Sequence, residues 1–156
     1  MLSSHKFIRD VDVFLQHFDR KNRLVVFTNG CFDLLHEGHL HLIAESKKLG
    51  DVLIVAVNDD ASVQRLKGVT RPIEHLETRM MHLTELDAVD YVLSFSGDTP
   101  LQIIEKIQPD ILVKGGDYKK EDVVGNHIAP KTVIIPLLEG FSTTKIIQSK
   151  NYFMKQ

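Results

Sequence analysis

The sequence predicts a doubly wound α/β fold built around a five-stranded parallel sheet. Continuous runs rich in valine, isoleucine and leucine recur along the chain, and unbroken apolar runs are typical of strands covered on both faces. Segments with helical spacing separate these runs, and strands that alternate with helices predict parallel pairing. The expected strands are residues 24–27, 51–58, 89–95, 110–114 and 132–135.

Helices are expected between the strands and before them. Apolar side chains recur near the helical period over residues 4–20, which predicts an amphipathic helix packed on the domain. A contact in a homodimer is the less favoured role for this helix. In the helix from residue 99 to about 108, Pro100 would occupy the first helical position. The remaining helices are expected from His36 to Gly50, over 59–66, 77–86 and 121–125, and from Ser142 onward.

Composition bounds the class of protein. The 156 residues suit one domain, residues 1–156, and 43% of them are hydrophobic, which is enough for a full core. The formal net charge of −2 argues against a broad basic surface for nucleic acid. The chain has one cysteine and no recognisable signal peptide or membrane span, so we expect a cytoplasmic protein without membrane partners.

Residues 24–50 are the most informative part of the chain. The first expected strand breaks at the turn Thr28-Asn29-Gly30, and a helix follows His36. The first amides of a helix have no partner inside it and carry partial positive charge, so a strand, a turn and a helix start form an anion site. His36 and His39 lie on one side of the first helical turn, where imidazoles can donate hydrogen bonds to phosphate. Gly38 between them leaves room for a bulky ligand.

Ligands of doubly wound sheets bind beyond the carboxyl ends of the strands, where the strand order reverses. The polar turns after the first, second and fourth expected strands fall at that edge. Asp33 is interpreted as a turn residue whose backbone lies at this edge. After the second strand, two roles stay open: contact with a ligand by Asn58, and capping of the next helix by Asp59 or Asp60.

The pattern H-x-G-H at residues 36–39, after a strand and behind N-G-C-F-D, resembles the signature of the nucleotidylyltransferase superfamily. The longer stretch T-N-G-C-F-D-L-L-H-E-G-H resembles the adenylyltransferases that make ADP-heptose for bacterial lipopolysaccharide. The string Lys114-Gly115-Gly116-Asp117-Tyr118 is characteristic of the same enzymes. The resemblance covers about residues 23–148 and implies a Rossmann-like fold of the HxGH nucleotidylyltransferase type.

Further motifs carry the resemblance. Lys67-Gly68-x-x-Arg71-Pro72 resembles the family's L-K-G-x-x-R-P loop, whose lysine would hold the sugar phosphate or pyrophosphate. Glu77-x-Arg79 resembles the E-x-R pattern and implies a contact between Arg79 and the triphosphate. Ser142-Thr143-Thr144 matches the S-T-T motif at a second helix start. The catalytic residues implied are His36, His39, Lys67 and Arg79, and the nucleotide-binding residues are Thr28, Asn29, Gly30, Cys31, Phe32, Asp33, Gly38, Asn58, Asp60, Lys114, Gly115, Asp117, Ser142, Thr143 and Thr144.

The activity implied by the resemblance is transfer of AMP from ATP to a sugar 1-phosphate, D-glycero-β-D-manno-heptose 1-phosphate, with Mg²⁺ as cofactor. The products would be ADP-heptose and pyrophosphate. No protein nucleophile is needed, because the attacking phosphate is already an anion, and catalysis rests on positioning and charge neutralisation. Some family members carry a sugar kinase domain on the same chain. We expect none in these 156 residues, and therefore expect a separate heptose kinase.

Alternatives remain open. The ending E-G-F-S-T-T-K-I at residues 139–146 resembles glycerol-phosphate cytidylyltransferases, whereas the K-G-G-D-Y string opposes that assignment. A non-catalytic nucleotide-binding or metal-sensing module is opposed by the presence of both H-x-G-H and S-T-T. A zinc site formed by Cys31, His36, His39 and His41 is less favoured, because His41 would point away from His39 on a helix.

Overall fold

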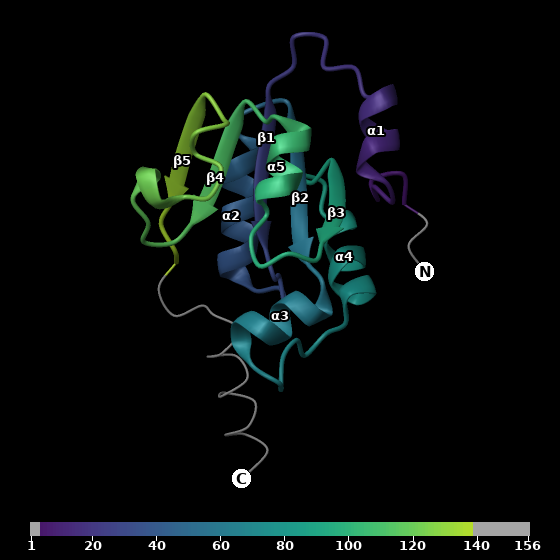
Figure 1. The fold of residues 1–156 in the computed structure, drawn as a ribbon, viewed down its shortest axis with the longest axis vertical. Coiled ribbons are helices and arrows are strands. Elements are labelled where there is room, and N and C mark those ends of the chain that lie inside the picture. Colours follow the sequence, from purple (N-terminus) through teal and green to yellow (C-terminus); the bar gives the residue numbers. More distant parts are fainter. Residues whose placement is uncertain (1–3, 139–156) are drawn as a thin grey trace.

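The computed structural model describes residues 4–138, which form a parallel sheet with helices on both faces (Figure 1). The five strands stand in the order β3-β2-β1-β4-β5, and every neighbouring pair is parallel. The predicted doubly wound sheet is therefore confirmed, and its strand order reverses between β1 and β4. The strands are β1 Val25–Gly30, β2 Val52–Asn58, β3 Tyr91–Phe95, β4 Ile111–Gly115 and β5 Lys131–Ile135.

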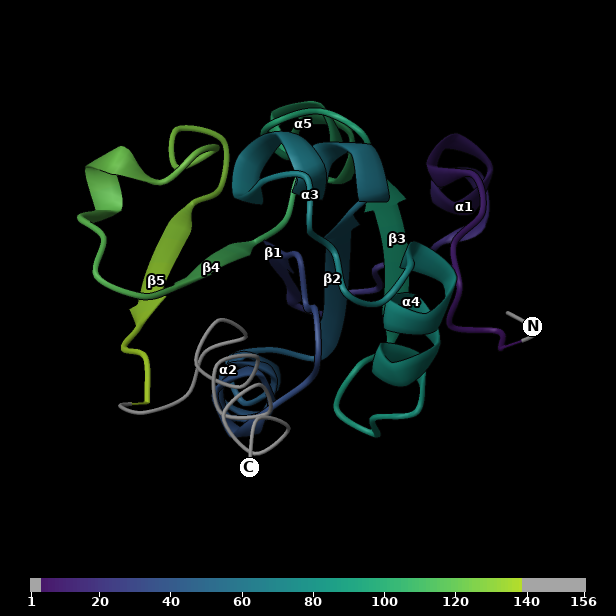
Figure 2. The same ribbon diagram turned by 90° about the horizontal axis from the view of Figure 1, so that it is seen from below.

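Two apolar cores, one on each face of the sheet, fix the helices in place. Side chains of α2 and α4 pack with Val26 and Leu53 on one face, and those of α1 and α5 pack around Phe27 and Ile54 on the other (Figure 2). All seven residues of β2 are buried, which explains its unbroken apolar run. The helices are α1 Val11–His17, α2 Glu37–Lys47, α3 Asp60–Lys67, α4 Leu76–Thr84 and α5 Leu101–Ile107, with a short 3-10 helix η1 at Lys120–Asp122.

The strand β1 is longer than the sequence predicted. The expected turn at Thr28-Asn29-Gly30 is wrong, because these residues continue β1 and pair with β2. Thr28 also pairs with β4, where its buried hydroxyl donates a hydrogen bond to the carbonyl oxygen of Val113 at 3.0 Å. For Asn29 and Gly30, pairing with β2 thus outweighs the local turn preference of Asn-Gly.

The N-terminal helix is shorter than the range 4–20. Asp10 caps α1 by accepting hydrogen bonds from the amides of Asp12 and Val13, so the helix begins at Val11. Before this cap the chain runs along β3, where the Ile8 amide donates to the carbonyl oxygen of Val92 at 2.8 Å. This segment therefore covers the outer edge of the sheet.

Pro100 immediately precedes α5 instead of opening it, and its carbonyl oxygen accepts a hydrogen bond from the Ile104 amide at 3.0 Å. The helix expected from Ser142 onward lies outside the described residues. Within residues 4–138, no helix is both long enough and apolar enough to span a membrane.

Candidate active site

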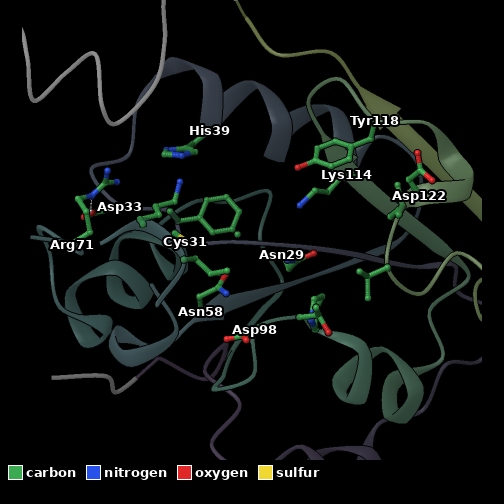
Figure 3. A pocket seen from close by; sticks show the side chains of 18 residues that line it. Asn29, Cys31, Asp33, His39, Asn58, Arg71, Asp98, Lys114, Tyr118 and Asp122 are labelled. Carbon is green, nitrogen blue, oxygen red and sulfur yellow. Dashed lines mark hydrogen bonds and ion pairs between the residues drawn. The ribbon is translucent and has the colours of Figure 1, made fainter. Parts of the chain in front are cut away.

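A cavity of about 480 Å³ opens beyond the carboxyl ends of β1, β2 and β4 (Figure 3). It lies where the strand order reverses, and its volume is in the range of sites for small molecules and cofactors. The start of α2, the end of α3 and the loops before α5 and around η1 complete its wall. The predicted site residues that line it are Asn29, Gly30, Cys31, Phe32, Asp33, His39, Asn58, Lys67 and Lys114.

The histidine pair forms the start of α2. His36 precedes the helix, and its Nδ1 accepts a hydrogen bond from the Gly38 amide at 3.0 Å. Nδ1 of His39 accepts one from the His36 amide at 3.3 Å, and the two rings stack with centroids 3.8 Å apart. Because each Nδ1 is an acceptor, the proton of the neutral ring resides on Nε2. His39 lines the cavity, whereas His36 does not line it and stacks on the His39 ring.

The electrostatic surroundings keep His39 neutral. Burial lowers the pKa of His39 to about 4, with further lowering by the charges of His36 and Lys67. Burial also lowers the pKa of His36. At pH 7 the His39 ring is therefore a donor of one hydrogen bond from Nε2 and carries no charge of its own.

Three cationic side chains line the cavity beside the neutral His39. Lys67 is the last residue of α3, Arg71 lies in the loop that follows, and Lys114 lies near the end of β4. Nζ of the half-buried Lys114 stands 5.0 Å from the ring centroid of Tyr118, and burial lowers its pKa. A chain with a net charge of −2 thus gathers cations at one place on its surface.

Asp33 fastens the loop between α3 and α4 to the end of β1. Its fully buried carboxylate pairs with Nε of Arg71 at 3.1 Å. The same oxygen accepts a hydrogen bond from the Ile73 amide at 2.7 Å, and the other oxygen accepts one from the Glu74 amide at 2.9 Å. The interpretation of Asp33 as a turn residue fits this geometry, and its carboxylate is engaged by the protein.

Arg79 is fully buried and does not line the cavity. Its guanidinium donates hydrogen bonds to the carbonyl oxygens of Glu74 at 2.9 Å and Cys31 at 2.7 Å. It also donates to the carbonyl oxygen of Asn58 at 2.8 Å and pairs with the Asp60 carboxylate at 2.7 Å. Arg79 therefore joins the ends of β1 and β2 to α3 and α4, and its predicted contact with a triphosphate finds no support in this geometry.

At the end of β2, Asn58 and Asp59 take different positions: Asp59 caps the next helix and Asn58 lines the cavity. Asp59 caps α3 by accepting a hydrogen bond from the Ser62 amide at 2.8 Å. Asn58 lines the cavity, and its side-chain amide donates to the Ser62 hydroxyl at 3.0 Å. Other predicted residues that do not line the cavity are Thr28, Gly38, Asp60, Gly115 and Asp117. Ser142, Thr143 and Thr144 lie outside the described residues.

Part of the cavity wall was missing from the predicted site. Tyr118, Asp122, Val123 and Val124 reach it from the segment after β4, and Asp98, Thr99 and Pro100 reach it from the loop before α5. Tyr118 carried a signal, since it ends the K-G-G-D-Y string. The loop before α5 carried none, because only the sheet order brings it to this edge.

Residues 4–138 hold no group of three histidine, cysteine, aspartate or glutamate side chains placed to bind one metal ion. Cys31 is a free thiol, half-buried in the cavity wall, and burial raises its pKa. A raised pKa disfavours the thiolate form that zinc requires. The geometry around Cys31 thus suits a packed side chain better than a metal ligand.

Residues 27–149 match the family model described as cytidylyltransferase-like. The chain belongs to the cytidylyltransferase-like family. Two relatives within this family are named bifunctional protein HldE: that of Helicobacter hepaticus is 51% identical over 144 residues and that of Campylobacter concisus 50% over 143 residues. Each alignment covers 92% of this chain and 30% of the relative, so the chain spans about a third of their length.

Solved structures agree with the cytidylyltransferase-like assignment. The lipopolysaccharide core biosynthesis protein from Thermoplasma volcanium is 30% identical, with a TM-score of 0.65 over 75% of this chain and 99% of that one. The pantoate-beta-alanine ligase from Francisella tularensis, 16% identical, shares the fold, with a TM-score of 0.63 over 98% of this chain and 80% of that one. The family inferred from H-x-G-H and K-G-G-D-Y is therefore confirmed.

Proposed function

We propose that the protein transfers AMP from ATP to a sugar 1-phosphate, with D-glycero-β-D-manno-heptose 1-phosphate as the first candidate acceptor. The products are ADP-heptose, a precursor of lipopolysaccharide core, and pyrophosphate. The observation that carries this proposal is the convergence of His39, Lys67, Arg71 and Lys114 on one cavity at the start of α2. Two polyanions must meet there, and the cations offset their repulsion.

The chemistry requires one displacement at phosphorus. An oxygen of the acceptor phosphate attacks the α-phosphorus of ATP and forms a new P–O bond, while the bond from that phosphorus to the α,β-bridging oxygen breaks and pyrophosphate leaves with the electron pair. The attacking oxygen is already an anion, so no protein base is needed. His39 donates its Nε2 hydrogen to a phosphate oxygen, and the lysines offset the charge that shifts toward the leaving group.

The nucleotide enters as its magnesium complex. Three carboxylates of the described residues line the cavity: Asp33 is held by Arg71, Asp98 pairs with Arg65 at an Nε–Oδ1 distance of 2.9 Å, and Asp122 belongs to η1. Asp122 could therefore contribute a carboxylate oxygen to Mg²⁺, and the triphosphate oxygens and water would supply the remaining ligands.

The two ends of the cavity differ in character. Tyr118, which is 49% exposed, and the neighbouring Val123 and Val124 offer an aromatic and apolar surface for the base. Arg71 lies at the opposite end, with His39 and Lys114 between them (Figure 3). We place the nucleoside at the Tyr118 end and the phosphates from His39 toward Arg71. We propose that a sugar kinase supplies the acceptor and that the reaction takes place in the cytoplasm, where ATP is available.

A screen of pyrophosphate release tests this function. ATP, CTP, GTP and UTP are each combined with a panel of sugar and alcohol phosphates, and turnover is expected only with ATP and a sugar 1-phosphate, lost on chelation and restored by Mg²⁺. Turnover with CTP and glycerol phosphate would establish the cytidylyltransferase alternative instead. Nucleotide binding without release in any combination would indicate a non-catalytic module.

His39→Ala is the companion variant in this screen. The variant is expected to fold and to lose about 10²-fold or more in turnover, because it removes a donor aimed at the reacting phosphate. Near-normal turnover in a folded variant would remove His39 from the mechanism. Elemental analysis of the wild type is expected to find no stoichiometric zinc, and one zinc per chain would revive the Cys31 site.

A further inference from the structure

Arg71 presents an unusual guanidinium to the cavity. Its side chain is only 10% exposed, and Nε is fixed by the fully buried carboxylate of Asp33 at 3.1 Å. Within residues 4–138 no protein group accepts a hydrogen bond from either Nη nitrogen. The described residues contain no buried side-chain nitrogen or oxygen without a partner. Both Nη nitrogens therefore reach open space, and the space that Arg71 lines is the cavity.

Asp33 explains why this guanidinium keeps one orientation. Its two oxygens also accept hydrogen bonds from the amides of Ile73 and Glu74, so the carboxylate is anchored to the loop that carries Arg71. An arginine free in solution must order its long side chain when it binds a ligand, and that ordering costs free energy. Asp33 removes much of that cost and leaves the two terminal N–H edges for a ligand.

A guanidinium held by its Nε edge is suited to a phosphate group. The planar fork can donate two parallel hydrogen bonds to two oxygens of one phosphate, which an ammonium cannot do. Lys67 lies four positions earlier in the chain and lines the same cavity, so a second cation stands on the same side. Arg71 lies across the cavity from Tyr118, the end at which we placed the nucleoside, so a ligand group beside Arg71 would be a phosphate remote from the base (Figure 3).

We propose that Arg71 binds a terminal phosphate group of a substrate, and that Asp33 is the positioning residue that orients it. The identity of the ligand rests on the function proposed above. Two sources have this chemistry: the phosphate of the sugar acceptor and the pyrophosphate end of the nucleotide. An ion pair with a purely structural role would stabilise the fold without changing the affinity for either.

The experiment uses Arg71→Ala and Arg71→Lys, with Arg20→Ala as the matched control. Arg20 also pairs with an aspartate, Asp110, at an Nη1–Oδ2 distance of 3.7 Å, but it lies away from the cavity. Three quantities are measured for each variant: the Kd of inorganic pyrophosphate by calorimetry, the KM for ATP and the KM for heptose 1-phosphate. Arg71→Ala is expected to weaken binding of one of these ligands about 10- to 100-fold, with a smaller effect on kcat.

Lysine at position 71 is expected to restore only part of that loss, because an ammonium lacks the planar fork that donates two parallel hydrogen bonds to one phosphate while Nε stays paired with Asp33. Arg20→Ala is expected to match the wild type. A raised KM for heptose 1-phosphate assigns the acceptor phosphate to Arg71, and a raised Kd for pyrophosphate assigns the nucleotide end. Folded Arg71→Ala with all three quantities unchanged overturns the proposal.

Asp33→Asn tests the positioning role. Asp33→Asn is expected to weaken the binding of the same ligand that Arg71→Ala affects. The double variant should weaken it by less than the product of the two single fold-changes. A loss of stability without a selective shift would make Asp33 purely structural. Should Asp33→Asn fail to fold, the Arg71 variants still decide whether Arg71 binds phosphate. If the wild type transfers AMP to no acceptor, the proposed function fails, while the pyrophosphate titration still tests Arg71.

Discussion

Replacing Arg79 by methionine keeps most of the side-chain length and removes the guanidinium that joins the ends of β1 and β2 to α3 and α4. The change leaves the carbonyl oxygens of Cys31, Asn58 and Glu74 without their donor and breaks the pair with Asp60. A hydrogen bond from a charged donor contributes about 1.5–3 kcal/mol, but bonds to one guanidinium are not additive. The Asp60 side chain is 42% exposed, so water can solvate it after the change.

These considerations give an expected loss of about 3–5 kcal/mol in the free energy of unfolding of Arg79→Met, the range for breaking a buried ion pair. A loss of this size lowers the Tm by about 6–20 °C in a domain of this length. The assay is urea denaturation followed by circular dichroism without ligand. Arg65→Met is the control, because Arg65 forms an exposed pair with Asp98 and should cost about 1 kcal/mol or less.

The opposite result would restore the contact that the E-x-R pattern suggested. If Arg79→Met unfolds within about 1 kcal/mol of the wild type and yet loses most of its turnover, Arg79 acts on the substrate. The structural argument would then be wrong, and a rearrangement that brings Arg79 into the cavity would be required.

Three further predictions test separate parts of the structure. The pKa of His39 is about 4 in the folded chain and ordinarily about 6.5, so the unfolded state binds more protons between these pH values. The free energy of unfolding should therefore fall by up to about 3 kcal/mol as the pH drops from 6.5 to 4. His39→Gln should lose most of this pH dependence, and the same dependence in variant and wild type would contradict the prediction. Gly125→Ala should lower the free energy of unfolding by about 1–3 kcal/mol, because φ of Gly125 is +88° and an added Cβ would lie 2.8 Å from Ile104. Gly68→Ala is the control and should lower it less, because φ is +109° there but no atom lies within 4 Å of the added Cβ. Equal losses in thermal unfolding would rule out the steric contribution. Thr28→Val should lose about 1–2 kcal/mol of stability through its buried hydroxyl and keep its KM for ATP, and a raised KM would show that Thr28 contacts the nucleotide.

The sequence predicted the fold well because its signals are local. All seven residues of β2 are buried, and a strand that is covered on both faces needs apolar residues at consecutive positions. The alternation with helices then left few parallel topologies to consider. The start of α2 was equally visible, since His36, Gly38 and His39 lie within one helical turn.

What the sequence missed depends on contacts between distant residues. Arg79 reaches the carbonyl oxygens of Cys31 and Asn58, which lie 48 and 21 positions away, and no local pattern separates such an arginine from one that binds a ligand. The same reasoning applies to Asp98, which reaches the cavity because the connection from β3 to β4 has to pass β2 and β1. At Thr28-Asn29-Gly30 the local signal was present but misleading, because strand partners decide the conformation there.

The stacked histidines have a consequence for how the site comes into being. The amides of His36 and Gly38 each donate a hydrogen bond to an imidazole nitrogen, so the contacts that cap α2 also hold the His39 ring at the cavity. We therefore expect the first turn of α2 and this side of the cavity to open and close as one cooperative unit. Hydrogen exchange at these two amides therefore reports directly on the integrity of the site, even in the absence of any substrate.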